Sequence, residues 1–148
     1  MDYRSGIAFI GGGNMAEALA GGIARTGLVP AGSIVLSAPR PERRKYLNET
    51  FGFRVTPENA EGVKACGTVF ISVKPQVLPS VMEEISGFFE PGHLVISIAA
   101  GITLQFLETR LPGVPVIRSM PNTPALIGAG ATVISPGKLA NPDMVNWA

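Results

Sequence analysis

The sequence is poor in reactive side chains: it has a single cysteine, Cys66, and a single histidine, His93, among its 148 residues. One cysteine excludes an internal disulfide and is typical of a protein in a reducing compartment. The chain has no CxxC or HxxxH pair of the kind that binds a transition metal, and its lone histidine and cysteine have no credible partners for a nucleophilic triad. Catalytic chemistry would then come largely from a bound cofactor.

Strong charge and long apolar runs are also lacking. The formal net charge is +1 with the basic residues scattered, and 16% of residues are charged against 46% hydrophobic, which fits one globular domain and gives no electrostatic footprint for nucleic acid. Glycine, proline or charge interrupts every apolar run before the roughly 20 residues that span a bilayer. Residues 1–5 lead directly into a strand pattern without room for a signal peptide, so we expect a cytoplasmic protein without membrane segments.

The most informative stretch is a buried strand pattern that runs into a glycine turn. The apolar residues 7–10 precede a GxGxxA motif formed by Gly11, Gly13 and Ala16. In a dinucleotide-binding turn, the first glycine permits the tight turn, the second lets the backbone approach a pyrophosphate, and the third small residue allows close helix packing. The same motif also occurs as a plain strand–helix turn. With a strand before it and a helix after it, we interpret it as a dinucleotide-binding turn.

The helix that follows is amphipathic and is expected to stop at Gly27. Its N-terminus offers unpaired N–H groups and the positive end of the helix dipole to phosphates. Asn14, with Glu17 three residues later, is typical of an N-cap pair.

The end of the second expected strand, residues 33–37, decides the type of dinucleotide. NAD-binding chains carry an Asp or Glu there, which would repel the 2′-phosphate of NADP. Residues 37–40 contain no acid, and they include Ser37 and Arg40, with Arg43 and Arg44 just beyond. A hydroxyl and guanidinium groups can hydrogen-bond a phosphate, so the local chemistry favours NADP(H). A solvated helix face remains the other interpretation of the three arginines.

The rest of the chain alternates between strand and helix patterns. Strands are expected at residues 53–55, 68–73, 94–98, 114–120 and 131–135, and helices at 41–51, 56–65, 77–88, 103–111 and from 141 onward. Within the helix at 41–51, Tyr46, Leu47 and Phe51 are expected to form the inward face. This order predicts an α/β fold: a Rossmann-type, doubly wound, mostly parallel sheet with helices on both faces.

Three short segments follow the carboxyl ends of these strands, the edge at which open α/β sheets bind ligands. Lys74 and Pro75 follow the strand at 68–73, and Lys74 either faces a cofactor or is a surface lysine. Ala99 and Ala100 leave space for a flat ring such as a nicotinamide, or serve close helix–sheet packing. Asn122 can bind a carboxamide or carboxylate, although an Asn in a loop is more often a turn former.

Three further polar residues carry weaker signals. Asn59 is either a surface amide or a group near the adenosine end of a dinucleotide. Cys66 is interpreted as a small buried hydrophobe rather than a reactive thiol. His93 lies at the amino end of its strand, opposite the expected ligand edge, which disfavours an acid–base role.

Four motifs together resemble the pyrroline-5-carboxylate reductase family. They are FIGGGNMAEALAGGI at residues 9–23, VKPQ at 73–76, SIAAGIT at 97–103 and MPNTPALIGAGAT at 120–132. The resemblance implies an NAD(P)-binding Rossmann domain and hydride transfer from NAD(P)H to the C=N bond of 1-pyrroline-5-carboxylate, giving L-proline. NADP(H) is the preferred cofactor on the residues above, with NAD(H) as the alternative.

The resemblance also assigns positions along the cofactor. It places Gly11, Gly12, Gly13, Asn14 and Met15 at the pyrophosphate, Ser37, Ala38 and Asn59 around the adenosine, Val73 and Lys74 along the cofactor, and Ala99, Ala100 and Asn122 near the nicotinamide. Pro75, which follows Lys74, is a further candidate for cofactor binding.

Members of the family continue beyond the segment that resembles this chain, as a helical domain that dimerises and binds the substrate. We therefore expect residues 1–140 to form the NAD(P)-binding domain and 141–148 to begin a helix that leads to such a C-terminal domain. On this expectation no catalytic residue lies within the chain, the intact protein is a homo-oligomer, and the 148 residues alone bind cofactor without turnover. The alternatives are an NADP-binding redox-sensing or regulatory module, and a reductase of another imine or keto acid.

Overall fold

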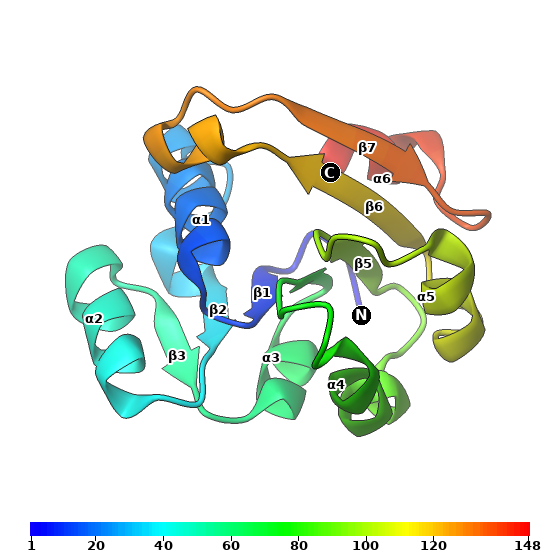
Figure 1. Cartoon of the computed structure of the whole chain (residues 1–148), viewed down its shortest axis with the longest axis horizontal. Coiled ribbons are helices and arrows are strands. Elements are labelled where there is room, and N and C mark those ends of the chain that lie inside the picture. Colours follow the sequence, from blue (N-terminus) through cyan, green and yellow to red (C-terminus); the bar gives the residue numbers. More distant parts are fainter.

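An open seven-stranded sheet runs through the computed structural model, which describes all 148 residues (Figure 1). Its strands are β1 (Ile7–Ile10), β2 (Ile34–Ser37), β3 (Arg54–Thr56), β4 (Thr68–Ile71), β5 (Leu94–Ser97), β6 (Val116–Pro121) and β7 (Thr132–Pro136). The order in space is β3-β2-β1-β4-β5-β6-β7. Strands β1 to β6 are parallel and β7 pairs antiparallel to β6. The predicted doubly wound, mostly parallel sheet is confirmed.

The helices connect these strands. They are α1 (Asn14–Thr26), α2 (Pro41–Phe51), α3 (Asn59–Ala65), α4 (Leu78–Ile85), α5 (Leu104–Arg110) and α6 (Pro142–Trp147), with 3-10 helices η1 (Ala31–Ser33), η2 (Ser86–Phe88) and η3 (Thr123–Ile127). None of them is both long enough and apolar enough to cross a membrane.

Local stop and start signals fix several of these bounds. Helices α1 and α2 each end at a glycine in the left-handed region, Gly27 and Gly52, both with φ of 74°. Such a residue closes a helix without a Cβ penalty. Thr103 caps α5 by accepting a hydrogen bond from the Phe106 N–H, and Asn141 caps α6 in the same way. These four predicted helix boundaries are confirmed.

Successive residues of the interior strand β1 face opposite layers of the molecule. On β1, Ala8 and Ile10 pack with the cluster beneath α3, α4 and α5, whereas Ile7 and Phe9 pack with the cluster beneath α1 and α2. All four residues are at most 2% exposed, because helices cover both faces of the parallel sheet. Burying each large apolar side chain contributes roughly 1.5–3 kcal/mol. The rigid sheet that results fixes the positions of the strand ends.

Three local predictions are wrong. Gly13, not Asn14, is the N-cap residue of α1, and no side chain caps that helix. Helix α3 begins at Asn59 rather than at Thr56, because Thr56 ends β3 and its hydroxyl accepts the Glu58 N–H in a local turn. Tyr46 is 43% exposed and does not belong to the inward face of α2.

The sheet reverses its strand order between β1 and β4. From β1 the chain proceeds outward to β2 and β3, then returns to place β4 on the other side of β1. In folds of this kind the crevice at the carboxyl ends of the two strands binds the ligand. Here the glycine turn, residues 11–13, lies at that crevice and leads directly into α1.

Candidate functional site

Two glycines of the turn are required by the packing around them. Gly11 has φ of 104°, and a Cβ there would lie 3.0 Å from the carbonyl oxygen of Ser72 and from Cγ1 of Val73. A Cβ on Gly12 would lie 3.1 Å from Cβ of Ala38. Larger residues at either position would strain the backbone or push the neighbouring strand ends apart.

Gly13 is different, because nothing lies within 4 Å of where its Cβ would be. The N–H groups that open α1, from Gly13 to Ala16, have no acceptor within the chain, and no side chain caps the helix. Unpaired N–H groups at the positive end of a helix dipole form an anion-binding site. The open space beside Gly13 is therefore a cradle that a side chain would fill and that an anionic group fits.

A cavity of about 150 Å³ lies on the β2 side of the turn and is called here the β2-side cavity. It is lined by Gly12, Gly13, Ala38, Pro39, Arg40 and Arg43. Arg40 is exposed, and its side chain makes no hydrogen bond or ion pair within the chain. Arg44 instead donates to the carbonyl oxygens of Ala38 and Pro39, at 2.7 and 2.8 Å, and so holds the loop that forms the cavity wall.

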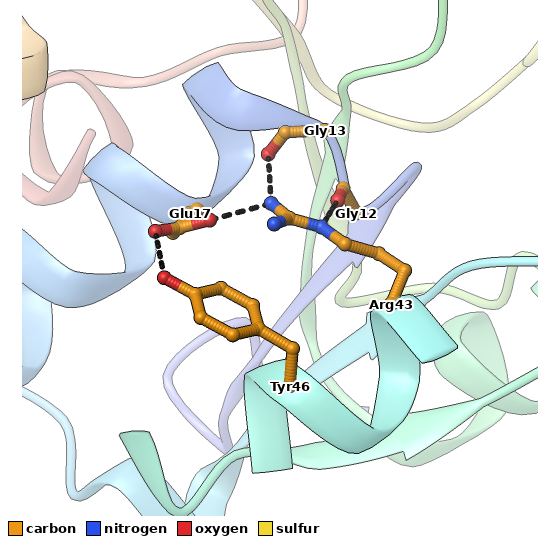
Figure 2. Close-up of polar contacts among 5 residues, drawn as sticks. All are labelled: Gly12, Gly13, Glu17, Arg43 and Tyr46. Atoms are coloured by element: carbon orange, nitrogen blue, oxygen red, sulfur yellow. Dashed lines mark hydrogen bonds and ion pairs between the residues drawn. The ribbon is translucent and has the colours of Figure 1, made fainter. Parts of the chain in front are cut away.

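Arg43 connects α2 to the glycine turn (Figure 2). Its Nε donates to the Gly12 carbonyl oxygen at 2.7 Å, and its Nη2 donates to the Gly13 carbonyl oxygen at 3.2 Å and to Oε2 of Glu17 at 2.6 Å. Tyr46 donates its hydroxyl proton to Oε1 of Glu17 at 3.1 Å. This hydrogen bond, together with the negative charge of Glu17, raises the pKa of Tyr46. The sequence signals missed this cluster, since Glu17 is 26 residues from Arg43.

A chain of polar side chains supports the turn from the other side. The Gly11 N–H donates to Oγ of Ser37 at 3.2 Å, and Ser37 donates to Oδ1 of Asn59 at 2.7 Å. Asn59 in turn donates to a carboxylate oxygen of Glu84 at 3.0 Å. Ser37 is only 1% exposed, and its hydroxyl is occupied by these contacts. Ser37 and Asn59 thus border the site through the network that fixes Gly11.

A second cavity, of about 320 Å³, lies at the carboxyl ends of β4, β5 and β6 and is called here the β5-side cavity. It is lined by Met15, Ser72, Val73, Lys74, Pro75, Ile98, Ala99, Ala100, Met120 and Pro121. Lys74 is exposed there and forms no ion pair. Ser72 was missed by the sequence analysis as part of an apolar strand; its hydroxyl donates to the Ile10 and Gly11 carbonyl oxygens at 3.0 and 2.8 Å.

The structure brings most of the predicted site residues together. Gly12, Gly13, Ala38 and Arg40 line the β2-side cavity, and Met15, Val73, Lys74, Pro75, Ala99 and Ala100 line the β5-side cavity. Gly11, Asn14, Ser37, Asn59 and Asn122 line neither. Asn122 is the N-cap residue of η3 and its Oδ1 accepts the Ala131 N–H at 2.9 Å, so this amide acts as a turn former.

Cys66 and His93 lie away from both cavities. Burial raises the pKa of the Cys66 thiol to about 11, against a smaller opposing effect of Arg54. His93 is fully buried; its Nδ1 lies 2.8 Å from the Glu90 N–H nitrogen and its Nε2 lies 3.1 Å from the Val63 carbonyl oxygen. Both ring nitrogens are therefore used to hold backbone.

The strand order, the glycine turn and the two flanking cavities define a Rossmann-type domain of the dinucleotide-binding class. The chain belongs to the family described as NADP oxidoreductase, coenzyme F420-dependent, whose model matches residues 6–101.

Individual relatives cover nearly the whole chain. It is 39% identical over 139 residues to the pyrroline-5-carboxylate reductase of Synechocystis sp., a match that covers 94% of this chain and 52% of that protein. Among solved structures, a pyrroline-5-carboxylate reductase from Coxiella burnetii matches with a TM-score of 0.91 and 32% identity, covering 97% of this chain and 54% of that one.

A pyrroline carboxylate reductase from Plasmodium falciparum, solved with NADP bound, matches with a TM-score of 0.85 and 25% identity and covers 99% of this chain and 53% of that one. The present chain thus spans about half the length of the curated relatives it matches.

Proposed function

We propose that this chain is the cofactor-binding part of a pyrroline-5-carboxylate reductase and that it binds NADP(H) in preference to NAD(H). The observation that carries the proposal is the glycine turn with its unpaired helix N–H groups, flanked by one cavity on each side. A dinucleotide has this shape, because its pyrophosphate lies between an adenosine and a nicotinamide.

The β2-side cavity fits the adenosine end of the cofactor. In this assignment the N–H groups from Gly13 to Met15 bind the pyrophosphate, while Ala38 contacts the adenosine. Arg40, without a partner in the chain, is the group that binds a 2′-phosphate. No carboxylate lines this cavity, so the cavity wall offers that phosphate no acidic contact.

The β5-side cavity fits the nicotinamide end. When bound, the cofactor supplies the hydride that reduces the C=N carbon of the substrate. Ala99 and Ala100 leave room for a flat ring against the backbone, and the apolar side chains of Met15, Val73 and Ile98 exclude water around it. Lys74 adds a positive charge at the rim, and Asn122, on the adjoining loop, keeps its Nδ2 for a carboxamide or carboxylate.

The groups that bind the substrate and donate the proton are assigned by this proposal to a C-terminal domain. Residues 1–140 are the NAD(P)-binding domain, and α6 within 141–148 begins the connection to the helical domain that dimerises. The relatives' greater length supports this division. We further propose that the intact protein is a cytoplasmic homo-oligomer, and that the 148 residues alone bind NADPH without turnover.

A chimera tests the proposal. Residues 1–148 are joined to the C-terminal half of the Synechocystis relative, and NADPH oxidation is followed with 1-pyrroline-5-carboxylate as substrate. We expect the chain alone to bind NADPH without turnover, and the chimera to form proline. The same chimera with Gly13→Leu controls for activity that does not depend on this chain's turn. A folded chimera that binds NADPH but reduces only other cyclic imines or keto acids would reassign the substrate, and absence of nucleotide binding would overturn the proposal altogether.

A further inference from the structure

Glu17 and Arg43 form an ion pair at the wall of the β2-side cavity. Their side chains are 23% and 19% exposed, respectively, so the pair is partly shielded from water. Glu17 uses both carboxylate oxygens, one toward Arg43 and one toward Tyr46. The guanidinium of Arg43 also lies over the Tyr46 ring, 5.3 Å from its centroid. Figure 2 shows the carboxylate held between the two side chains.

One edge of the Arg43 guanidinium is fully used and the other is open. Nε and Nη2 donate to the Gly12 and Gly13 carbonyl oxygens and to Glu17, whereas Nη1 has no acceptor within the chain. In Figure 2 this third nitrogen carries no dashed line. Since Arg43 lines the β2-side cavity beside Arg40, the cavity has two guanidinium groups with donors to spare.

Glu17 itself does not line the β2-side cavity. The carboxylate is paired with Arg43, which does line the cavity, and so reduces the net positive charge that a ligand there meets. Oε2 of Glu17 lies 2.6 Å from Nη2 of Arg43, a residue of the cavity wall, which is well inside a Debye length of about 10 Å at 0.1 M salt. At this range one charge alters the binding of another at a partly shielded site severalfold.

We propose that Glu17, acting through Arg43, sets how strongly the site prefers a 2′-phosphorylated dinucleotide over an unphosphorylated one. The ion pair fixes the Arg43 guanidinium on the glycine turn, at the wall of the β2-side cavity, and partly neutralises its charge. Glu17 is thus a positioning and charge-setting residue rather than a ligand contact. This inference rests on the proposed NADP(H) binding.

The test is Glu17→Gln, which keeps an oxygen acceptor for Arg43 and removes the charge. We expect NADPH to bind about three- to tenfold more tightly and NADH to gain less, because NADH carries the shared pyrophosphate but lacks the 2′-phosphate. The adenosine half alone should behave the same way, with 2′,5′-ADP gaining more than 5′-AMP. The gain should shrink at high salt, since screening weakens the interaction between charges. Glu49→Gln, on the exposed face of α2, is the matched control for loss of one negative charge and should leave the ratio unchanged.

A double-mutant cycle shows whether the effect passes through Arg43. In an Arg43→Met background, Glu17→Gln should change the NADPH-to-NADH ratio by a different factor than in the unsubstituted protein, with thermal unfolding confirming that each variant is folded; the same factor in both backgrounds would show that Glu17 does not act through Arg43. Equal changes for both dinucleotides would mean that Glu17 only supports the turn, and an unchanged NADPH affinity would likewise overturn the inference. If the unsubstituted protein bound neither dinucleotide, the proposed function itself would fail.

Discussion

The two edges of the sheet differ in whether polar groups are left without partners. At the amino edge, Thr68 donates to the Tyr3 carbonyl oxygen and accepts from Nε1 of Trp147, and both ring nitrogens of His93 hold backbone. At the carboxyl edge, Ser37 and Arg44 are also satisfied, but the side chains of Arg40 and Lys74 have no partners and the first N–H groups of α1 have no acceptors. Polar groups that the fold satisfies maintain the structure, and those it leaves unsatisfied are available to a ligand.

The largest expected effect comes from comparing two glycine substitutions, one at each edge of the sheet. Gly13→Leu places a side chain in the cradle beside α1, where nothing in the chain obstructs it, and should weaken NADPH binding at least about 100-fold. Gly32→Leu is the matched control, because Gly32 also has open space around its Cβ position but lies before β2, at the amino edge. Calorimetric titration measures both affinities, and thermal unfolding should show both variants folded. If the two variants bound NADPH equally well, the open space beside Gly13 would not be part of the binding site.

The amino edge is tested by His93→Leu. The substitution leaves the Glu90 N–H and the Val63 carbonyl oxygen buried without their side-chain partner, and should lower the free energy of unfolding by about 2 kcal/mol. Urea unfolding measures this loss. NADPH affinity under native conditions should not change, and a selective loss of affinity in a stable variant would contradict the division between the edges.

Within the carboxyl edge, Arg40→Met tests whether the β2-side cavity, and not the β5-side cavity, binds the 2′-phosphate. We expect NADPH to bind about tenfold more weakly, since one charge-assisted contact to the 2′-phosphate is lost, while NADH binding stays the same. Fluorescence titration with each dinucleotide measures the ratio. The exposed Arg25, in the last turn of α1, provides the control variant Arg25→Met, which should affect neither. An equal loss for both dinucleotides would place Arg40 elsewhere along the cofactor.

The last prediction is a pH dependence of stability that comes from Cys66 at the amino edge. Because burial raises the pKa of Cys66 from 9.0 to about 11, the folded state holds the thiol proton where the unfolded state has lost it. Stability from this group is complete below pH 9 and should fall as the pH rises from about 9 to about 11. Urea unfolding of Cys66→Ala should lack this decline relative to the unsubstituted protein. Alkylation of Cys66 at pH 8 should also be slow, on the order of 100-fold below a free thiol, and rapid alkylation would contradict the burial.

Features set by neighbouring residues could be predicted from the sequence. Pro41 and Gly52 bound α2 at the predicted residues, and the turn from β1 into α1 follows from Gly11 and Gly13. Each of these signals acts within a few residues of its own position, where backbone conformation is decided.

Features that depend on distant partners could not be predicted. Glu17 fits a local N-cap pattern, yet its carboxylate pairs with Arg43 and Tyr46 of another helix, which provide a stronger, charge-assisted interaction. Ser72 also depends on a distant partner: its hydroxyl, just after β4, donates to the carbonyl oxygen of Gly11, 61 residues earlier. The sequence predicts which strand ends meet, but the side-chain contacts between them depend on the folded packing.

One measurement tests the central claim, that the carboxyl edge binds an NADP-type dinucleotide across the glycine turn. Calorimetric titration of the unsubstituted protein with NADPH and with NADH, in the same buffer, should give one site for each and an NADPH affinity about tenfold higher, as expected for an added charge-assisted contact. Tighter binding of NADH, or no binding of either dinucleotide, would contradict the account.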